Sequence, residues 1–85
     1  LDNGESDTDF YYLASGTSYY IYQHGDQNGT THVKVVSQNQ QLIWQADMVY
    51  NQTKFFSVST SGWYYCSTEN TTTGANQHLH SDWQH

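Results

Sequence analysis

Tyrosine and histidine side chains that could bind a ligand recur at every second position in two neighbouring segments. The first segment carries Tyr20, Tyr22 and His24, and the second carries His32 and Lys34. Residues two apart share one face of a β-strand. Aromatic rings offer a large contact area with a polar tip, and imidazole and ammonium groups donate hydrogen bonds. We therefore predict that these five side chains form one ligand-binding surface.

That surface requires a β-hairpin. Tyr19–Tyr22 and His32–Val36 are rich in aromatic and β-branched residues, and Gly25–Gly29 between them is rich in turn residues. A five-residue turn would place Ile21 opposite Val33 on an apolar face, and the tyrosines, histidines and lysine on the other face. A second sheet covering the tyrosine face would make it part of the core instead, and the sequence leaves both readings open.

A second group of candidate ligands lies near the end of the sequence. His78 and His80 form an H-x-H pair, with His85 nearby. In an extended chain such a pair can chelate zinc or copper. The alternative is a polar tail that binds metal only adventitiously, because closed sites need further oriented groups.

Catalytic motifs are missing from the sequence. The single cysteine, Cys66, has no evident activating neighbour, so we predict a buried structural thiol, with intermolecular pairing as the alternative. There is no phosphate-binding loop, nucleophile elbow, metalloprotease motif or catalytic carboxylate pair. The sequence therefore predicts a protein that is not an enzyme and needs no cofactor.

Short strands separated by turns must position these groups. Phe10–Ala14, Lys54–Ser59 and Trp63–Thr68 read as further strands. Residues 41–50 fit a strand better than the helix that their apolar residues also allow. Turns at 51–53 and 61–62 would place Met48 opposite Phe56, and Val58 opposite Tyr65.

The pattern predicts an all-β protein, a small antiparallel β-sandwich or partly open barrel of about five to six short strands. Residues 10–68 would form this domain. Residues 1–9 would be an acidic, flexible arm, and residues 69–85 a polar, flexible tail. An exposed strand edge could pair with a second copy, so the sequence also allows a homodimer.

Charge and composition restrict the partners. The 85 residues carry a formal net charge of −6 with only two lysines and no arginine, which excludes ordinary binding to nucleic acids. No apolar run is long enough to span a bilayer. The uncharged, tyrosine-rich composition is typical of an exported protein, so we expect a secreted, extracellular location.

One segment resembles a known family. Tyr20–Gly25, then Thr31 and His32, then Val35 and Val36, resemble the central part of lactococcin 972-type bacteriocins, and Tyr64 and Tyr65 match a paired tyrosine near the end of those chains. The resemblance covers about half of the chain. It implies a small secreted antiparallel β-sandwich that acts from outside on bacteria by interfering with a cell-wall precursor.

These observations lead to one expected function and two alternatives. We expect a secreted, non-enzymatic protein that binds a cell-envelope glycan or precursor, as an antibacterial bacteriocin does. The alternatives are a carbohydrate- or protein-binding module of a larger surface protein, and a metal-binding domain that uses its histidines.

Overall fold

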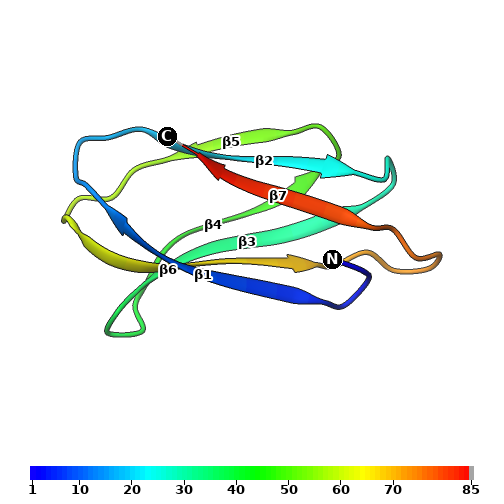
Figure 1. Ribbon diagram of the computed structural model, residues 1–85, viewed down its shortest axis with the longest axis horizontal. Helices are drawn as coiled ribbons and strands as arrows, with labels where there is room; N and C mark the ends of the chain where they lie inside the picture. Colours follow the sequence, from blue (N-terminus) through cyan, green and yellow to red (C-terminus); the bar gives the residue numbers. More distant parts are fainter. Residues whose placement is uncertain (85) are drawn as a thin grey trace.

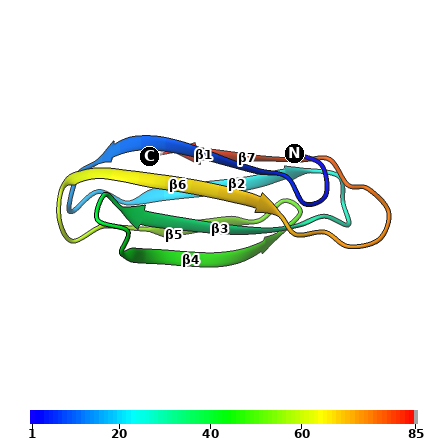
Figure 2. The same cartoon turned by 90° about the horizontal axis from the view of Figure 1, so that it is seen from below.

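A computed structural model describes residues 1–84 as two antiparallel sheets packed face to face (Figures 1 and 2). Its strands are β1 (Ser6–Leu13), β2 (Tyr19–Gly25), β3 (Thr30–Ser37), β4 (Leu42–Val49), β5 (Thr53–Phe56), β6 (Gly62–Asn70) and β7 (Leu79–Gln84). One sheet has the order β1-β6-β3-β4 and the other β5-β2-β7. The predicted all-β antiparallel sandwich is confirmed, and it is not closed into a barrel.

The chain crosses repeatedly between the two sheets. Within the described residues, β3 and β4 are the only consecutive strands that pair with each other. The strand predicted at residues 41–50 is confirmed as β4. β2 pairs with β5 and β7, whereas β3 pairs with β4 and β6. The predicted hairpin of residues 19–36 is therefore wrong, because its two strands lie in different sheets.

The loop between β2 and β3 explains this difference, because it packs against the start of β7. Gly25 has a φ of 120°, and a Cβ atom there would lie 2.5 Å from the carbonyl oxygen of His78. The backbone N–H of Asp26 donates to that oxygen at 3.0 Å, and the Asp26 carboxylate accepts from the His78 N–H at 2.8 Å. The glycines thus allow the chain to cross from one sheet to the other between β2 and β3. Such a connection, an arch, needs the same turn residues as a hairpin.

The other two predicted pairings fail for the same reason. β4 and β5 lie in different sheets, so Met48 is not the strand partner of Phe56. β5 and β6 are likewise separated, and Val58 and Cys66 are both buried in one core cluster rather than on opposite faces. In β2, β3 and β4 the alternation of apolar residues correctly indicates which side chains enter the core, whereas in β6 it is wrong, because Cys66 enters the core and Tyr65 is exposed. It does not indicate which strand lies alongside, because opposed sheets share one core.

The core between the sheets is apolar at one end and polar at the other. Ile21 and Val33, expected to be neighbours in a hairpin, meet across this core with Met48. A larger cluster contains Leu13, Tyr19, Val35, Phe56, Val58, Tyr64 and Cys66, with Trp44 and Trp83 packed against it. At the polar end, the fully buried Gln23 accepts hydrogen bonds at its side-chain oxygen from Thr31 at 3.1 Å and Ser81 at 2.5 Å.

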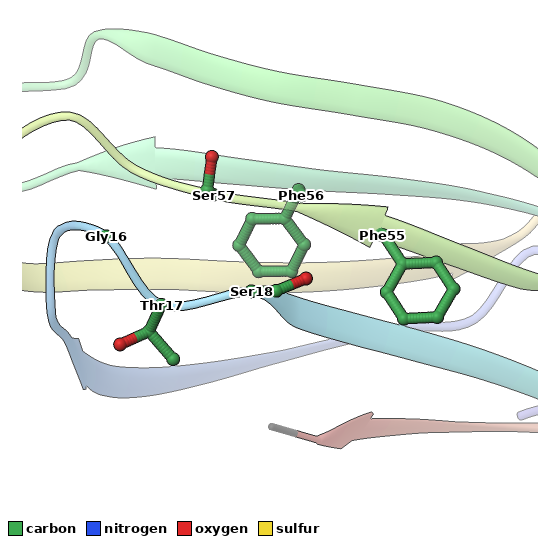
Figure 3. A pocket seen from close by; sticks show the side chains of 6 residues that line it. All are labelled: Gly16, Thr17, Ser18, Phe55, Phe56 and Ser57. Atoms are coloured by element: carbon green, nitrogen blue, oxygen red, sulfur yellow. The ribbon is translucent and has the colours of Figure 1, made fainter.

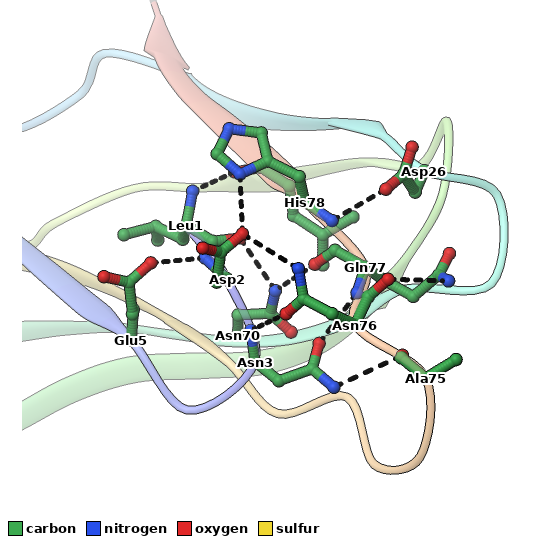
Figure 4. Close-up of polar contacts among 11 residues, drawn as sticks. Leu1, Asp2, Asn3, Glu5, Asp26, Asn70, Ala75, Asn76, Gln77 and His78 are labelled. Carbon is green, nitrogen blue, oxygen red and sulfur yellow. Dashed lines mark hydrogen bonds and ion pairs between the residues drawn. The ribbon is translucent and has the colours of Figure 1, made fainter.

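Both ends of the described chain belong to the sandwich, in contrast to the expected arm and tail. Leu1 pairs with Leu79 through two backbone hydrogen bonds of 2.8 and 2.9 Å. The buried Asn70 side chain donates to the carbonyl oxygens of Leu1 and Gln77 at 2.9 and 2.6 Å (Figure 4). Within the expected tail, residues 69 and 70 end β6, and β7 supplies Leu79 and Trp83 to the core and completes the three-stranded sheet.

Candidate functional site

The five residues predicted to form one surface lie on opposite outer faces of the sandwich. Tyr20, Tyr22 and His24 alternate with buried residues of β2 and point away from the core of the three-stranded sheet. His32 and Lys34 occupy the corresponding positions of β3 in the four-stranded sheet. The single-surface prediction is therefore wrong, because the arch between β2 and β3 divides these residues between two sheets.

Four aromatic rings gather on the outer face of the four-stranded sheet. Phe10 and Tyr12 from β1 lie beside Tyr65 and Trp63 from β6, as strand partners. Phe10 stacks on Trp63 with ring centroids 5.2 Å apart and contacts Tyr65 at 4.7 Å, while Tyr12 meets Trp63 edge-on at 5.7 Å. These residues are 37 to 55% exposed. We call them the four-ring patch. An exposed cluster of this kind on a monomer commonly marks a binding surface.

The patch occupies one half of that face, and polar groups occupy the other half. Along β6 the outward residues after Trp63 and Tyr65 are Ser67 and Glu69. In the antiparallel β1, Ser6 and Thr8 lie beside them and precede the rings in the sequence. The apolar half continues across β3 and β4 through Val36 and Leu42. Four outward positions at 3.2–3.4 Å per residue give the face a length of about 20 Å.

A hollow of about 280 Å³ lies in the polar half. Its lining includes Lys34, His32, Glu69 and three hydroxyl residues, Ser6, Thr8 and Ser67. His32 is held by Asp47 at 2.7 Å and Gln45 at 3.1 Å. Within the described chain no carboxylate forms an ion pair with Lys34, so its ammonium group can bind a ligand oxygen.

Another hollow, of about 300 Å³, borders the opposite end of the patch. Trp63 forms part of its wall, together with polar residues of the β3–β4 turn, Ser37, Gln38 and Asn39, and with Ser61. Hydrogen-bonding groups therefore flank the aromatic rings at both ends. A surface of this form can hold an elongated ligand that presents apolar patches and hydroxyl groups along its length.

The outer face of the three-stranded sheet carries a second series of rings. Phe55 contacts Tyr20 at 5.5 Å, Tyr22 stacks on His24 at 5.4 Å, and His24 stacks on His80 at 5.3 Å. We call these five residues the ring row. The alternative that a second sheet covers the tyrosines is wrong for Tyr20 and Tyr22, which are half-buried on the outer side of the sandwich.

An open hollow of about 430 Å³ lies at the Phe55 end of this face (Figure 3). Phe55, Phe56 and the hydroxyl groups of Thr17, Ser18 and Ser57 line it. Its walls contain no ionisable side chain. The hollow therefore adds hydroxyl groups to the end of the ring row.

The predicted metal ligands do not form a closed site. His78 and His80 lie close together, with ring centroids 4.8 Å apart. The His78 ring also donates a 2.9 Å hydrogen bond to the Asp2 carboxylate, which lowers the pKa of that carboxyl group. Among residues 1–84, no three histidine, cysteine or acidic side chains are arranged to hold a metal ion. His85 lies outside the described residues.

The predicted burial of Cys66 is confirmed. The thiol is 1% exposed in the larger core cluster. Burial, with a smaller contribution from the charge of Asp9, raises the pKa of Cys66 to about 12. The thiolate form that a nucleophile requires is therefore disfavoured at ordinary pH.

The four-ring patch was not recognised from the sequence as a site. Phe10 and Tyr12 are separated from Trp63 and Tyr65 by some fifty residues, and only the β1–β6 pairing joins them. The available signal was the alternation of exposed rings within each segment.

Comparisons with protein-family models, curated proteins and solved structures find no match. No helix among the described residues is long and apolar enough to cross a membrane.

Proposed function

We propose that this protein is a secreted, non-enzymatic β-sandwich that binds a glycan of the bacterial cell envelope. The binding surface is the outer face of the four-stranded sheet. The observation that carries the proposal is the four-ring patch, flanked at both ends by hollows lined with hydrogen-bonding side chains. Sugars combine apolar C–H faces with hydroxyl groups, and such a surface offers partners for both.

Within this site the residues have different roles. Phe10 and Trp63 supply the contact area, because their stacked rings form the centre of the patch. Lys34 and the neighbouring serine and threonine hydroxyls bind the ligand's oxygen atoms in the polar hollow. His32 is oriented by Asp47 and forms part of the lining of that hollow. Two of the five residues singled out in the sequence thus belong to the proposed surface.

Retention on purified peptidoglycan sacculi tests the proposal. The wild-type chain should sediment with the sacculi, and Trp63→Ala should weaken retention about tenfold or more, because a central aromatic contact is typically worth at least ~1–2 kcal/mol. Tyr50→Ala is the matched control, since it removes an exposed ring in the turn after β4, outside the patch. Thermal unfolding of each variant checks that the fold persists.

Two results would overturn the proposal. One is the absence of wild-type retention on sacculi and on envelope polysaccharides. The other is equal retention of Trp63→Ala and Tyr50→Ala, because the patch would then not be the contact surface.

The same variants test antibacterial action, which the resemblance to lactococcin 972-type bacteriocins implies. Purified wild-type chain should inhibit the growth of susceptible bacteria, and Trp63→Ala should lose potency in proportion to its loss of retention. Binding without inhibition would instead select a glycan-binding module of a larger surface protein.

A further inference from the structure

We propose that the ring row is a second glycan-binding site, which makes the protein a bivalent module able to bridge two envelope chains. This inference rests on the proposed function and extends it to the opposite face. The ring row comprises Phe55, Tyr20, Tyr22, His24 and His80 on the outer side of the three-stranded sheet. The two sites lie back to back across the sandwich, so one ligand cannot occupy both (Figure 2).

The ring row is held in a fixed arrangement although it faces solvent. The Tyr22 hydroxyl donates to the Asn51 side-chain oxygen at 2.6 Å, and the His24 ring lies 2.9 Å from the Asp82 carboxylate. The Tyr22 and His24 rings are nearly parallel, with an interplanar angle of 10°. Rigid side chains lose little entropy when a ligand binds, so such an arrangement favours recognition.

The shape of the ring row suits a linear ligand. Tyr20, Tyr22 and His24 follow β2 at intervals of about 6.4–6.8 Å, set by two residues of strand. Phe55 from β5 and His80 from β7 continue the line on either side, and both are exposed, Phe55 to 65%. Outward polar partners of β2, Thr53, Asp82 and Gln84, border the rings.

Charge selects a neutral, hydroxyl-rich ligand over an acidic polymer or a second copy of the chain. Neither lysine lies on this face. Lys34 is on the opposite sheet, and Lys54 is on the inner face because strand partners share a face and its partner, Ile21, faces inward. The Asp82 carboxylate already has a hydrogen-bond partner in the His24 ring, 2.9 Å away. Two copies would each carry a formal charge of −6 and repel one another. An uncharged glycan meets neither obstacle.

Agglutination of sacculi separates one binding face from two. A bivalent chain should clump the suspended particles, as followed by turbidity, and should bind them about 100-fold or more tightly than a variant with one working face. Phe55→Ala combined with His80→Ala removes the exposed ends of the ring row, and Trp63→Ala disables the four-ring patch. Each should still sediment with sacculi but fail to agglutinate them. Titration with neutral chitotetraose should give two binding sites per wild-type chain and one per variant.

Other outcomes overturn the inference. If the Phe55→Ala/His80→Ala variant agglutinates like wild type, or if wild type binds one chitotetraose, the ring row is not a site, while the proposed function stands. If sedimentation velocity shows a wild-type dimer that this double variant abolishes, the row is an interface between copies. If neither the wild type nor any variant is retained on sacculi, the proposed function and the inference both fail.

Discussion

We expect the Cys66 thiol to be unreactive, because β6 places it in the core. The thiol lies in the core beside Val35, its partner in β3, and burial raises its pKa to about 12. We expect native protein to resist labelling by a thiol reagent at about pH 8, where an ordinary cysteine reacts readily, and to label fully in denaturant. The rate of release of the reagent's chromophore measures this.

An exposed cysteine provides the comparison. A chain carrying Cys66→Ala and Ser59→Cys places the thiol in the exposed loop after β5 and should react at once. Equal rates for native Cys66 and for this control would contradict the burial that the sandwich imposes.

Asn70 joins three segments through one amide group. Its side-chain N–H groups reach Leu1 and Gln77, and its oxygen accepts from the Thr72 backbone at 3.0 Å. Asn70→Ala removes the donor to the Gln77 carbonyl group, one of the two donors to the Leu1 carbonyl group and the acceptor for the Thr72 N–H, so we expect a loss of about 1–3 kcal/mol in the free energy of unfolding. Urea denaturation measures it. Asn28→Ala at an exposed position should change stability by less than about 0.5 kcal/mol.

At the scale of the elements, strand pairing can be tested by cross-linking. The Oγ atoms of Thr8 and Ser67 lie 2.9 Å apart across β1 and β6. Cysteines at these two positions, in a Cys66→Ala background, should therefore oxidise to a disulfide, since their side chains face each other directly. Mass spectrometry after mild oxidation detects the bond. Cysteines at Tyr22 and His32 should stay reduced, because those residues lie on opposite faces. A disulfide in that second pair would support a β2–β3 hairpin and contradict the arch between the sheets.

The sequence predicted the positions of the strands better than it predicted which strands pair with one another. Alternation placed Ile21, Val33 and Met48 in the core correctly, because a buried face imposes a period of two wherever the strand lies. It could not distinguish an arch from a hairpin at Gly25–Gly29, since both need turn residues. β7 was missed because Leu79, Ser81 and Trp83 alternate within a strongly polar stretch, and only Leu79 and Trp83 are apolar.

The candidate site was only partly predictable for the same reason. The residue types were recognised, and Tyr20, Tyr22 and His24 do share a face, as do His32 and Lys34. The grouping of these two sets was wrong because it depended on one connection. The four-ring patch depends on a pairing between distant segments, for which a single sequence carries no direct signal.

At the scale of the whole molecule, the connectivity should make folding slow. Apart from β3 and β4, the described strands pair with partners distant in sequence, as β1 does with β6. Long-range pairing requires costly loop closure, so we expect refolding over milliseconds to seconds. With no proline in the chain, no additional phase of tens of seconds from prolyl isomerisation should appear. Stopped-flow tryptophan fluorescence can follow both. Refolding in microseconds would contradict this expectation.

Because the chain crosses between the two sheets, the order of synthesis also limits when the protein can begin to fold on a ribosome. β1 waits for β6, and β2 lacks one of its two neighbours until β7 has been made. Until β5 has been made, β3 with β4 is the only pair of described strands that can form, and the core stays incomplete until β7 supplies Leu79 and Trp83. Until β7 has been made, the three-stranded sheet lacks one edge, so the emerging chain remains without its complete core for longer than a chain whose strands pair in sequence order.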